Sequence, residues 1–502
     1  MKKRPVVIQK IRLLPVTDQI LVKTKPALCR LSAFILIAVS LGCTPEPESW
    51  GTLAQEQKPA GEATVAVPRP VRFDLPVPQL SDTQKPLFYA GRALAQQPWV
   101  KAPTATTQRD GLGPLFNARS CLACHLNGGR GEMPDKAGES LFTAFVRISV
   151  PGLDEHEGAN PEPVYGTQIQ NQSVSLSSQL GIPPQPGELQ AEAHVSVRWL
   201  EEKFRYPDGH ETVLRKPEIV IRDLSNGPLQ SDTMMSLRNA PGMYGMGLLA
   251  AIPEQSLDAL ADPQDKNSDG ISGRRNQVWD PVSQSIRAGR FGLKANRPDL
   301  PVIVAAAFAH DIGITNALFP HQPCTQAQPL CLKQPDGNDE EGTELSNNLL
   351  NMTVNFVRDS AVPASRLGEQ HIAGRQVFYD AGCQQCHQPS FVTAGLPGAE
   401  YLGQQTIWPY TDLLLHDMGP GLADGRPDFL ATGSEWRTAP LWGLGLQRKV
   451  TGGRLSLLHD GRARSVEEAV LWHGGEAAAA RNYFIQLPMV QRRELEIFVE
   501  AL

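Results

Sequence analysis

The sequence lacks long apolar runs and an excess of positive charge. Apolar residues make up 41% of the 502 residues and the mean hydropathy is −0.26, which excludes a protein with several membrane-spanning helices. Residues 1–42 contain eight Lys or Arg and one Asp, a charge of +7, so the total of −6 leaves −13 for residues 43–502. This acidic balance argues against nucleic acid as a partner and favours encounter with a basic protein.

The N-terminal segment has the pattern of a secretion signal. Lys23, Lys25 and Arg30 precede a twelve-residue apolar run at 31–42, which is too short to span a bilayer of about 30 Å as a helix. The run ends in Leu-Gly before Cys43, and a small residue before cysteine is what lipoprotein processing requires. We therefore expect a lipoprotein-like signal peptide at 1–42, a lipidated Cys43 and a periplasmic protein anchored to the outer membrane. Ordinary signal cleavage with a free Cys43 is the alternative.

Four of the eight cysteines lie in two copies of the motif Cys-x-x-Cys-His. In this motif each thiol adds to one vinyl group of a haem, and the adjacent histidine binds the iron. A zinc site or a redox-active cysteine pair is the alternative, but two copies behind a secretion signal favour haem. The sequence thus predicts two covalently bound haem c groups, held by Cys121, Cys124 and His125 and by Cys383, Cys386 and His387.

A weak internal repeat surrounds the two motifs. Ala-Gly-Arg occurs at 90–92 and at 373–375, and a phenylalanine precedes each first motif cysteine by five residues, Phe116 and Phe378. Two related haem modules follow from this repeat. We expect a flexible tether at 43–80, an N-terminal cytochrome c-like haem domain at 81–150, an insertion at 151–365 and a C-terminal cytochrome c-like haem domain at 366–502.

The expected fold class is mainly α. Residues 301–310 and 343–357 have the apolar spacing of helices. The insertion also contains a stretch rich in Val, Trp, Phe and Tyr at 194–206, followed by Pro-Asp-Gly at 207–209, which predicts a β-hairpin. The insertion is therefore expected to be mixed α/β.

The sixth ligand of each haem iron determines whether that haem serves electron transfer or reacts with a substrate. A methionine there raises the reduction potential, whereas an open position permits reaction. Met418 is the preferred sixth ligand, although a methionine in a turn is often only a packing residue. The other candidates are Met243, Met246, His310, His371, His416, His459 and His473.

Two further features concern stability. Asp265, Asn267 and Asp269 alternate before Gly270 as in a calcium loop, but position twelve is Asn276 and not a bidentate Glu. Calcium binding and a plain Asx-rich turn both remain open, and an ion here would brace the insertion. Cys324 and Cys331 are expected to form a disulfide, because an oxidising compartment disfavours two free thiols.

Several long motifs carry a family resemblance. They are residues 111–125, 291–320, 416–425, 435–445 and 457–477. With the two haem motifs, they make the chain similar from about residue 80 to 502 to the di-haem oxidoreductase family, described as peroxidases, some of whose members are labelled thiol oxidoreductases. The C-terminal part also resembles the bacterial di-haem cytochrome c peroxidases and the related methylamine-utilisation haem enzyme. The resemblance supports two cytochrome c-like domains.

The resemblance implies that H₂O₂ is reduced at one haem while the other relays electrons from a small donor cytochrome. The chain departs from the peroxidase pattern in two places. Leu141 stands where those peroxidases place a displaceable histidine, with His156 the next one, and their usual sixth ligand to the second haem falls near Ser434 or Glu435. Cleaving the O–O bond also needs an acid–base group, for which Glu132 is a candidate because it follows the first motif closely.

The leading functional hypothesis is a periplasmic di-haem oxidoreductase that reduces H₂O₂ or a related small oxidant, with electrons from a small soluble cytochrome. The alternative is a non-catalytic two-haem electron-transfer protein. A third hypothesis is oxidation of a thiol or protein substrate. Contact with a membrane is expected only through the lipid anchor.

Overall fold

The computed structural model of the chain describes residues 52–105, 109–340 and 342–502. The chain divides into two units, 1–49 and 50–502, and all the described residues belong to the second. The predicted signal peptide and Cys43 lie outside the described residues. Within the part that the structure describes, we find no helix with the length and apolar character needed to cross a membrane.

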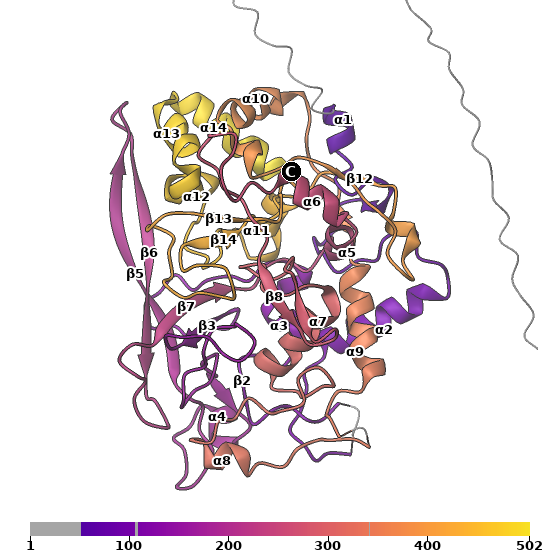
Figure 1. The fold of residues 1–502 in the computed structure, drawn as a ribbon, viewed down its shortest axis with the longest axis vertical. Coiled ribbons are helices and arrows are strands. Elements are labelled where there is room, and N and C mark those ends of the chain that lie inside the picture. Colours follow the sequence, from indigo (N-terminus) through magenta and orange to yellow (C-terminus); the bar gives the residue numbers. More distant parts are fainter. Residues whose placement is uncertain (1–51, 106–108, 341) are drawn as a thin grey trace, which may run out of the picture. The chain divides into compact units, whose positions relative to one another are not determined.

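Helices are short and follow one another with irregular connections (Figure 1). The α-helices are α1 (Leu53–Glu56), α2 (Gln84–Gln96), α3 (Cys121–Cys124), α4 (Leu176–Leu180), α5 (Met246–Ala250), α6 (Glu254–Leu260), α7 (Leu300–Ala307), α8 (Pro329–Leu332), α9 (Asn347–Arg358), α10 (Ile372–Asp380), α11 (Gln447–Val450), α12 (Val466–Trp472), α13 (Ala478–Gln486) and α14 (Met489–Ala501).

The two Ala-Gly-Arg segments lie where pairs of helices cross. α2 packs on α9, and α10 packs on α14. A Cβ atom on Gly91 would lie 2.0 Å from the main-chain oxygen of Met352, and one on Gly374 would lie 2.0 Å from that of Glu494. Only glycine permits such close approach of two backbones. The repeat therefore marks two equivalent crossings, and the helix that partners α2 comes from the segment predicted to be an insertion.

Strands form seven two-stranded sheets in the described residues. They are β1 (Thr64–Val65) with β10 (Val362–Pro363), β2 (Leu115–Phe116) with β4 (Gln172–Ser173), β3 (Ala144–Ser149) with β7 (Met234–Asn239), β5 (His194–Arg205) with β6 (Glu211–Arg222), β8 (Gln277–Asp280) with β9 (Ser285–Ala288), β11 (Phe391–Val392) with β12 (Thr406–Ile407), and β13 (Leu415–Asp417) with β14 (Glu435–Arg437). The pair β5–β6 is the long hairpin in Figure 1.

The mainly α fold class is wrong, because the protein is 29% helical and 18% strand. Most strands have only two to six residues, which is too short for alternation to reveal them in a sequence. Several strand pairs also join segments that are distant in the sequence, as β3 does with β7, so no turn motif between the two strands predicts their pairing.

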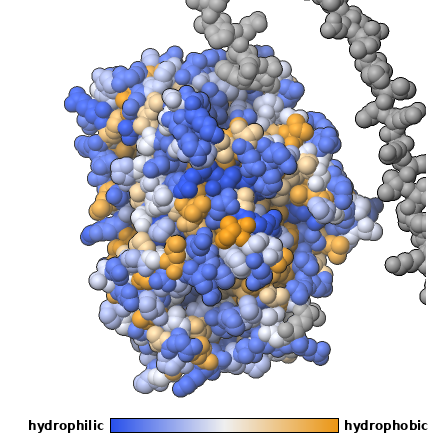
Figure 2. Space-filling view, viewed as in Figure 1, coloured by the Kyte–Doolittle hydropathy of each residue, from blue (hydrophilic) through white to orange (hydrophobic). Residues whose placement is uncertain are grey.

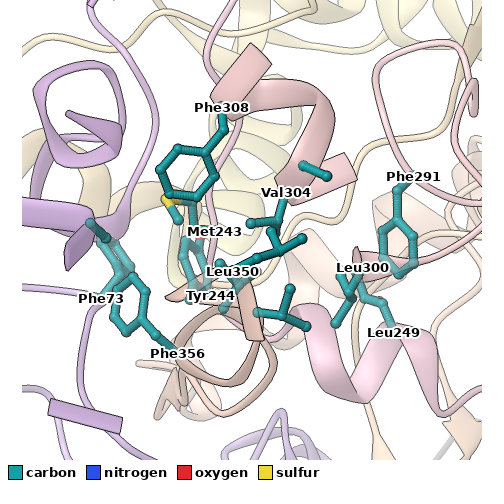
Figure 3. Packing of buried hydrophobic residues seen from close by; sticks show 14 of the residues in the cluster. Phe73, Met243, Tyr244, Leu249, Phe291, Leu300, Val304, Phe308, Leu350 and Phe356 are labelled. Atoms are coloured by element: carbon teal, nitrogen blue, oxygen red, sulfur yellow. The ribbon is translucent and has the colours of Figure 1, made fainter. Parts of the chain in front are cut away.

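Two apolar cores each lie beside one Cys-x-x-Cys-His motif. The larger includes stacked Phe73 and Tyr244, with ring centroids 4.3 Å apart, and Phe356 from α9 (Figure 3). Cys121 packs against this core. The other core brings together α10, α12, α13 and α14, and Cys383 packs against it. A third cluster joins the hairpin to β3. On the face shown in Figure 2, hydrophilic residues predominate and hydrophobic residues lie in small groups between them.

Residues 52–80 do not form the flexible tether expected from their composition. Phe73 and Val77 are buried, and β1 pairs in parallel with β10. Glu56 at the end of α1 is 1% exposed, and its carboxylate accepts hydrogen bonds from Arg375 and from the Tyr410 hydroxyl. The composition of the segment did not predict this packing, because only a few residues, spaced apart in the sequence, make the buried contacts. Residues 43–51 lie outside the described residues.

Candidate haem-binding sites

The first motif forms the short helix α3, with His125 directly after it. The Nδ1 atom of His125 lies 2.6 Å from the main-chain oxygen of Pro241. This hydrogen bond keeps the proton on Nδ1 and leaves the lone pair of Nε2 available for iron. Burial lowers the pKa of His125, which favours the neutral ring that an iron ligand must be.

The second motif holds its histidine in the same way, but with a different local backbone structure. Gly382, with φ of 77°, leads into a 3-10 turn, η5 (Cys383–Gln385), and Cys386 and His387 follow. The Nδ1 atom of His387 lies 2.9 Å from the main-chain oxygen of Tyr410. Burial is the main cause that lowers the pKa of His387 to about 4. Both motif histidines thus direct a neutral Nε2 away from the backbone that holds the ring.

A cavity adjoins the second motif. Cys383, Cys386 and His387 line it together with apolar side chains of α10, α12, α13 and α14. Three arginines, Arg130, Arg437 and Arg481, also line it. The Nε atoms of Arg130 and Arg481 and one terminal nitrogen of Arg437 are buried without a hydrogen-bond partner in the described residues.

The residues of this cavity fit a haem. A haem has an apolar ring and two carboxylate groups, so apolar walls and arginines with unused buried N–H groups complement it. Arg130 follows His125 by five residues and donates to the main-chain oxygen of Leu458, so the first motif's loop supplies part of the second site's wall.

Two adjacent polar residues, His310 and Asp311, lie near the first motif. His310 and Asp311 lie in the π-helical turn η3 (Phe308–Ile312), which continues α7. The main-chain oxygen of Asp311 accepts hydrogen bonds from the N–H groups of Asn117 and Ala118, just before Cys121. π-turns within helices are frequent at functional sites.

The carboxylate of Asp311 lies close to the first pair of thiols. Burial raises the pKa of the Cys121 and Cys124 thiols to about 12, and the charge of Asp311 adds to both shifts. The Asp311 side chain accepts a hydrogen bond from Gln168 at 3.0 Å. Burial also raises the pKa of Asp311, so this carboxyl holds a proton more readily than an exposed one.

His310 is a neutral imidazole beside buried arginines. Burial, with the positive charges of Arg147 and Arg297, lowers the pKa of His310 well below its usual value. No hydrogen bond to its ring nitrogens occurs within the described residues. Sequence analysis considered His310 only as an iron ligand and missed Asp311 and Arg147. The consecutive His-Asp pair at the end of an apolar helix was the available indication of this group.

The candidates for the sixth iron ligand are distributed unevenly. Four of them, His416, Met418, His459 and His473, line the cavity of the second motif. His416 has Nε2 2.8 Å from Asp412 and Nδ1 2.7 Å from Glu476, so both ring nitrogens are engaged. Two further histidines also have partners: Nε2 of His459 lies 2.8 Å from the main-chain oxygen of Arg437, and Nδ1 of His371 accepts the N–H of Gly368. Met243 is buried in the larger core, and half-buried Met246 packs against it.

The residues singled out from the peroxidase pattern have other contacts. Glu132 forms an ion pair with Arg454. Glu435 forms an ion pair with Arg274, at 2.6 Å, and Ser434 accepts a hydrogen bond from the N–H of Met418. Leu141 is buried in the third cluster, and His156 stacks on Trp279. These contacts leave Glu132 less suited to proton transfer than His310 and Asp311.

The loop of alternating acidic and amide residues is held by its own side chains. Asp265 accepts from the N–H of Gly270, Asn267 from that of Asp269, and Asp269 from that of Ile271. Among the residues that the structure describes, no group of three or more His, Cys, Asp or Glu side chains could hold a metal ion. The bonds are those of Asx turns. Calcium binding stays a prediction.

Cys324 and Cys331 form a disulfide. Within the described residues, the four motif cysteines are the free ones.

Comparisons with known proteins gave one match. A family model described as "Di-haem oxidoreductase, putative peroxidase" matches residues 55–502. No curated protein and no solved structure matches the chain.

Proposed function

Since the chain belongs to the di-haem oxidoreductase family, we propose that it is a periplasmic enzyme that reduces H₂O₂ or a related small oxidant at one haem, with electrons relayed by the other. The haems are attached through Cys121 and Cys124 and through Cys383 and Cys386. His125 and His387 are the axial ligands. The periplasmic location rests on the apolar run at 31–42 and on thioether attachment, which is made outside the cytoplasm.

Two bound haems supply two iron centres that can each give and take one electron, which matches the two electrons consumed when one H₂O₂ and two protons become two waters. The electrons come from a small basic redox protein, such as a soluble cytochrome. The charge of −13 on residues 43–502 supports this partner. The chain's own residues must orient the groups and handle the protons.

The observation that carries the proposal is that groups able to exchange a proton lie beside the first motif, whereas the corresponding groups beside the second motif bond to one another. Beside the first motif, the ring of neutral His310 has no hydrogen-bond partner within the described residues and Asp311 has a raised pKa. His310 can accept a proton at its unprotonated ring nitrogen, and the carboxyl of Asp311 can hold one. Beside the second motif, His416, Asp412 and Glu476 bond to one another instead. We therefore assign reduction of the oxidant to the first site and electron relay to the second.

The test uses the full chain matured in a strain that attaches haem c. We expect two haems per chain that resist extraction by acid acetone, and consumption of H₂O₂ coupled to oxidation of a reduced small cytochrome. Two low-spin six-coordinate irons in both redox states, without H₂O₂ turnover, would show the non-catalytic electron-transfer protein instead. A product formed from thiols with H₂O₂ and no donor cytochrome would identify the third alternative.

A further inference from the structure

We propose that His473 is the sixth ligand of the iron bound by His387, so that two imidazoles hold the second haem from opposite sides. This inference rests on the proposed function only in requiring a haem at the second motif. It replaces the prediction that Met418 takes this position.

The ring of His473 has the arrangement of the two motif histidines. His473 follows the last residue of α12, a helix that begins after Ser465, whose hydroxyl accepts from the N–H of Glu468. The Nδ1 atom of His473 lies 2.6 Å from the main-chain oxygen of Ala469, one turn earlier. This bond keeps the proton on Nδ1 and leaves the lone pair of Nε2 free.

The arrangement is restricted to three histidines. Within the described residues, only His125, His387 and His473 donate Nδ1 to a main-chain oxygen and leave Nε2 without a hydrogen bond. His371 is different: its Nδ1 also lies 3.3 Å from the main-chain oxygen of Gly368, but it accepts the N–H of the same residue at the shorter distance of 2.9 Å and therefore carries no proton. Second-shell hydrogen bonds of this kind fix the tautomer and the ring orientation of metal-binding histidines. Two of the three are motif histidines, and His473 is the third.

His473 and His387 face the same space. Both line the cavity of the second motif, together with Cys383 and Cys386. They come from different segments: His387 follows η5, and His473 follows α12. The cavity therefore offers one more imidazole with a free Nε2.

The turn after His473 is fixed against the segment that carries Met418. Gly475 has φ of 52°, and a Cβ atom there would lie 2.2 Å from the main-chain oxygen of Asp417. A side chain would prevent this contact, so glycine allows the backbone that follows His473 to lie against Asp417. The thioether of Met418 packs among apolar residues of the second core and has no comparable bond to orient it.

Bis-histidine ligation suits the role of relay. An iron with both axial positions filled by imidazole has no open site for an oxidant, and it has a lower potential than one with a methionine ligand. The second haem would then pass electrons and leave the oxidant to the first.

The test compares EPR and absorption spectra of the oxidised holoprotein with those of two variants. We expect His473→Ala to lose the low-spin component of one haem and gain a high-spin one, with two haems still attached. Added imidazole should restore the low-spin component. The matched control, Met418→Leu, changes a side chain of the same cavity and should leave the spectra unchanged. Unchanged spectra in His473→Ala, or loss of the component in Met418→Leu, would overturn the assignment.

A second variant covers failure of His473→Ala to mature. His473→Met should keep the iron low-spin and raise the potential of that haem. An unchanged potential would overturn the assignment. Wild-type protein with two haems, the expected spectra and no H₂O₂ turnover would refute the proposed enzyme and leave the ligand assignment standing. A chain without haem at the second motif would refute both.

Discussion

The main-chain oxygen of Tyr410 accepts a hydrogen bond from Nδ1 of His387 at 2.9 Å. Tyr410 is fully buried, has φ of 53°, and donates its hydroxyl to Glu56 at 2.6 Å. A positive φ is uncommon for a residue other than glycine, so surrounding contacts must hold this backbone in place. The segment at the start of the described chain thus supports the histidine proposed to bind the second iron.

Glu56→Ala should therefore destabilise the protein. The change removes a buried carboxylate that bonds Arg375 and Tyr410, and loss of one member of a buried ion pair costs about 3 kcal/mol or more. The control is Glu62→Ala, whose exposed ion pair with Lys58 is worth less than about 1 kcal/mol. Urea unfolding of both variants measures the difference. Equal unfolding free energies for the two variants would show that the buried bonds of Glu56 stabilise the protein no more than the exposed ion pair of Glu62.

Each Cys-x-x-Cys-His motif should attach its haem independently of the other motif. Replacing Cys383 and Cys386 by Ser should halve the haem content per chain, because thioether attachment needs both thiols. Replacing the disulfide cysteines, Cys324 and Cys331, should leave it unchanged. The pyridine haemochrome spectrum, divided by protein concentration, gives the ratio. A serine variant that keeps its full haem content would refute attachment at this motif.

His310→Gln should reduce H₂O₂ turnover by about 100-fold with no loss of haem, since a positioned acid–base group typically contributes at least that factor. Glutamine keeps polarity and approximate size but cannot carry the proton. His321→Gln changes an exposed histidine and serves as the control. Steady-state oxidation of a reduced small cytochrome by H₂O₂ measures turnover. Equal rates for the two variants would remove His310 from the reaction.

Arg437→Leu should lower the reduction potential of the second haem. Arg437 lines its cavity with a buried nitrogen that has no partner in the described residues, and a nearby positive charge stabilises the added electron. Arg198→Leu removes an exposed arginine of the hairpin and should leave the potential unchanged. Potentiometric titration followed by absorption distinguishes the two. A potential that stays constant in Arg437→Leu would place the arginine away from the haem.

The buried carboxyl of Glu192 should make stability depend on pH. Burial raises its pKa from 4.5 to about 8, although the N–H of Gln170 donates to it at 2.6 Å. Between these values the folded chain holds a proton that the unfolded chain has released. Stability therefore falls as pH rises through this range, by at most about 1.4 kcal/mol for each pH unit.

Glu192→Gln should reduce this slope by the contribution of one carboxyl group, because an amide does not titrate. Urea unfolding at about pH 5 and about pH 8 tests this. Glu201→Gln, on an exposed position of the hairpin, should keep the slope. A slope in Glu192→Gln equal to that of the wild type would show that Glu192 does not contribute to it.

Sequence reasoning did best where residues close in the chain act together. The Cys-x-x-Cys-His motifs and the long motifs identified the family, and the family match confirmed it. It failed for the fold class and for residues 52–80. The pairing of Ala144–Ser149 with Met234–Asn239 and the burial of Glu56 against Arg375 both join distant segments, and neither leaves a local pattern.

The same division holds for the proposed site. Local spacing alone decides which cysteines and histidines can attach a haem, because the thiols and the adjacent imidazole must come from one turn of chain. Tertiary structure decides that Pro241 and Tyr410 hold the two rings, that Asp311 bonds the segment just before the first motif and that His473 shares a cavity with His387. Those contacts depend on how helices and loops pack around two cores, and packing joins residues that chain order keeps apart.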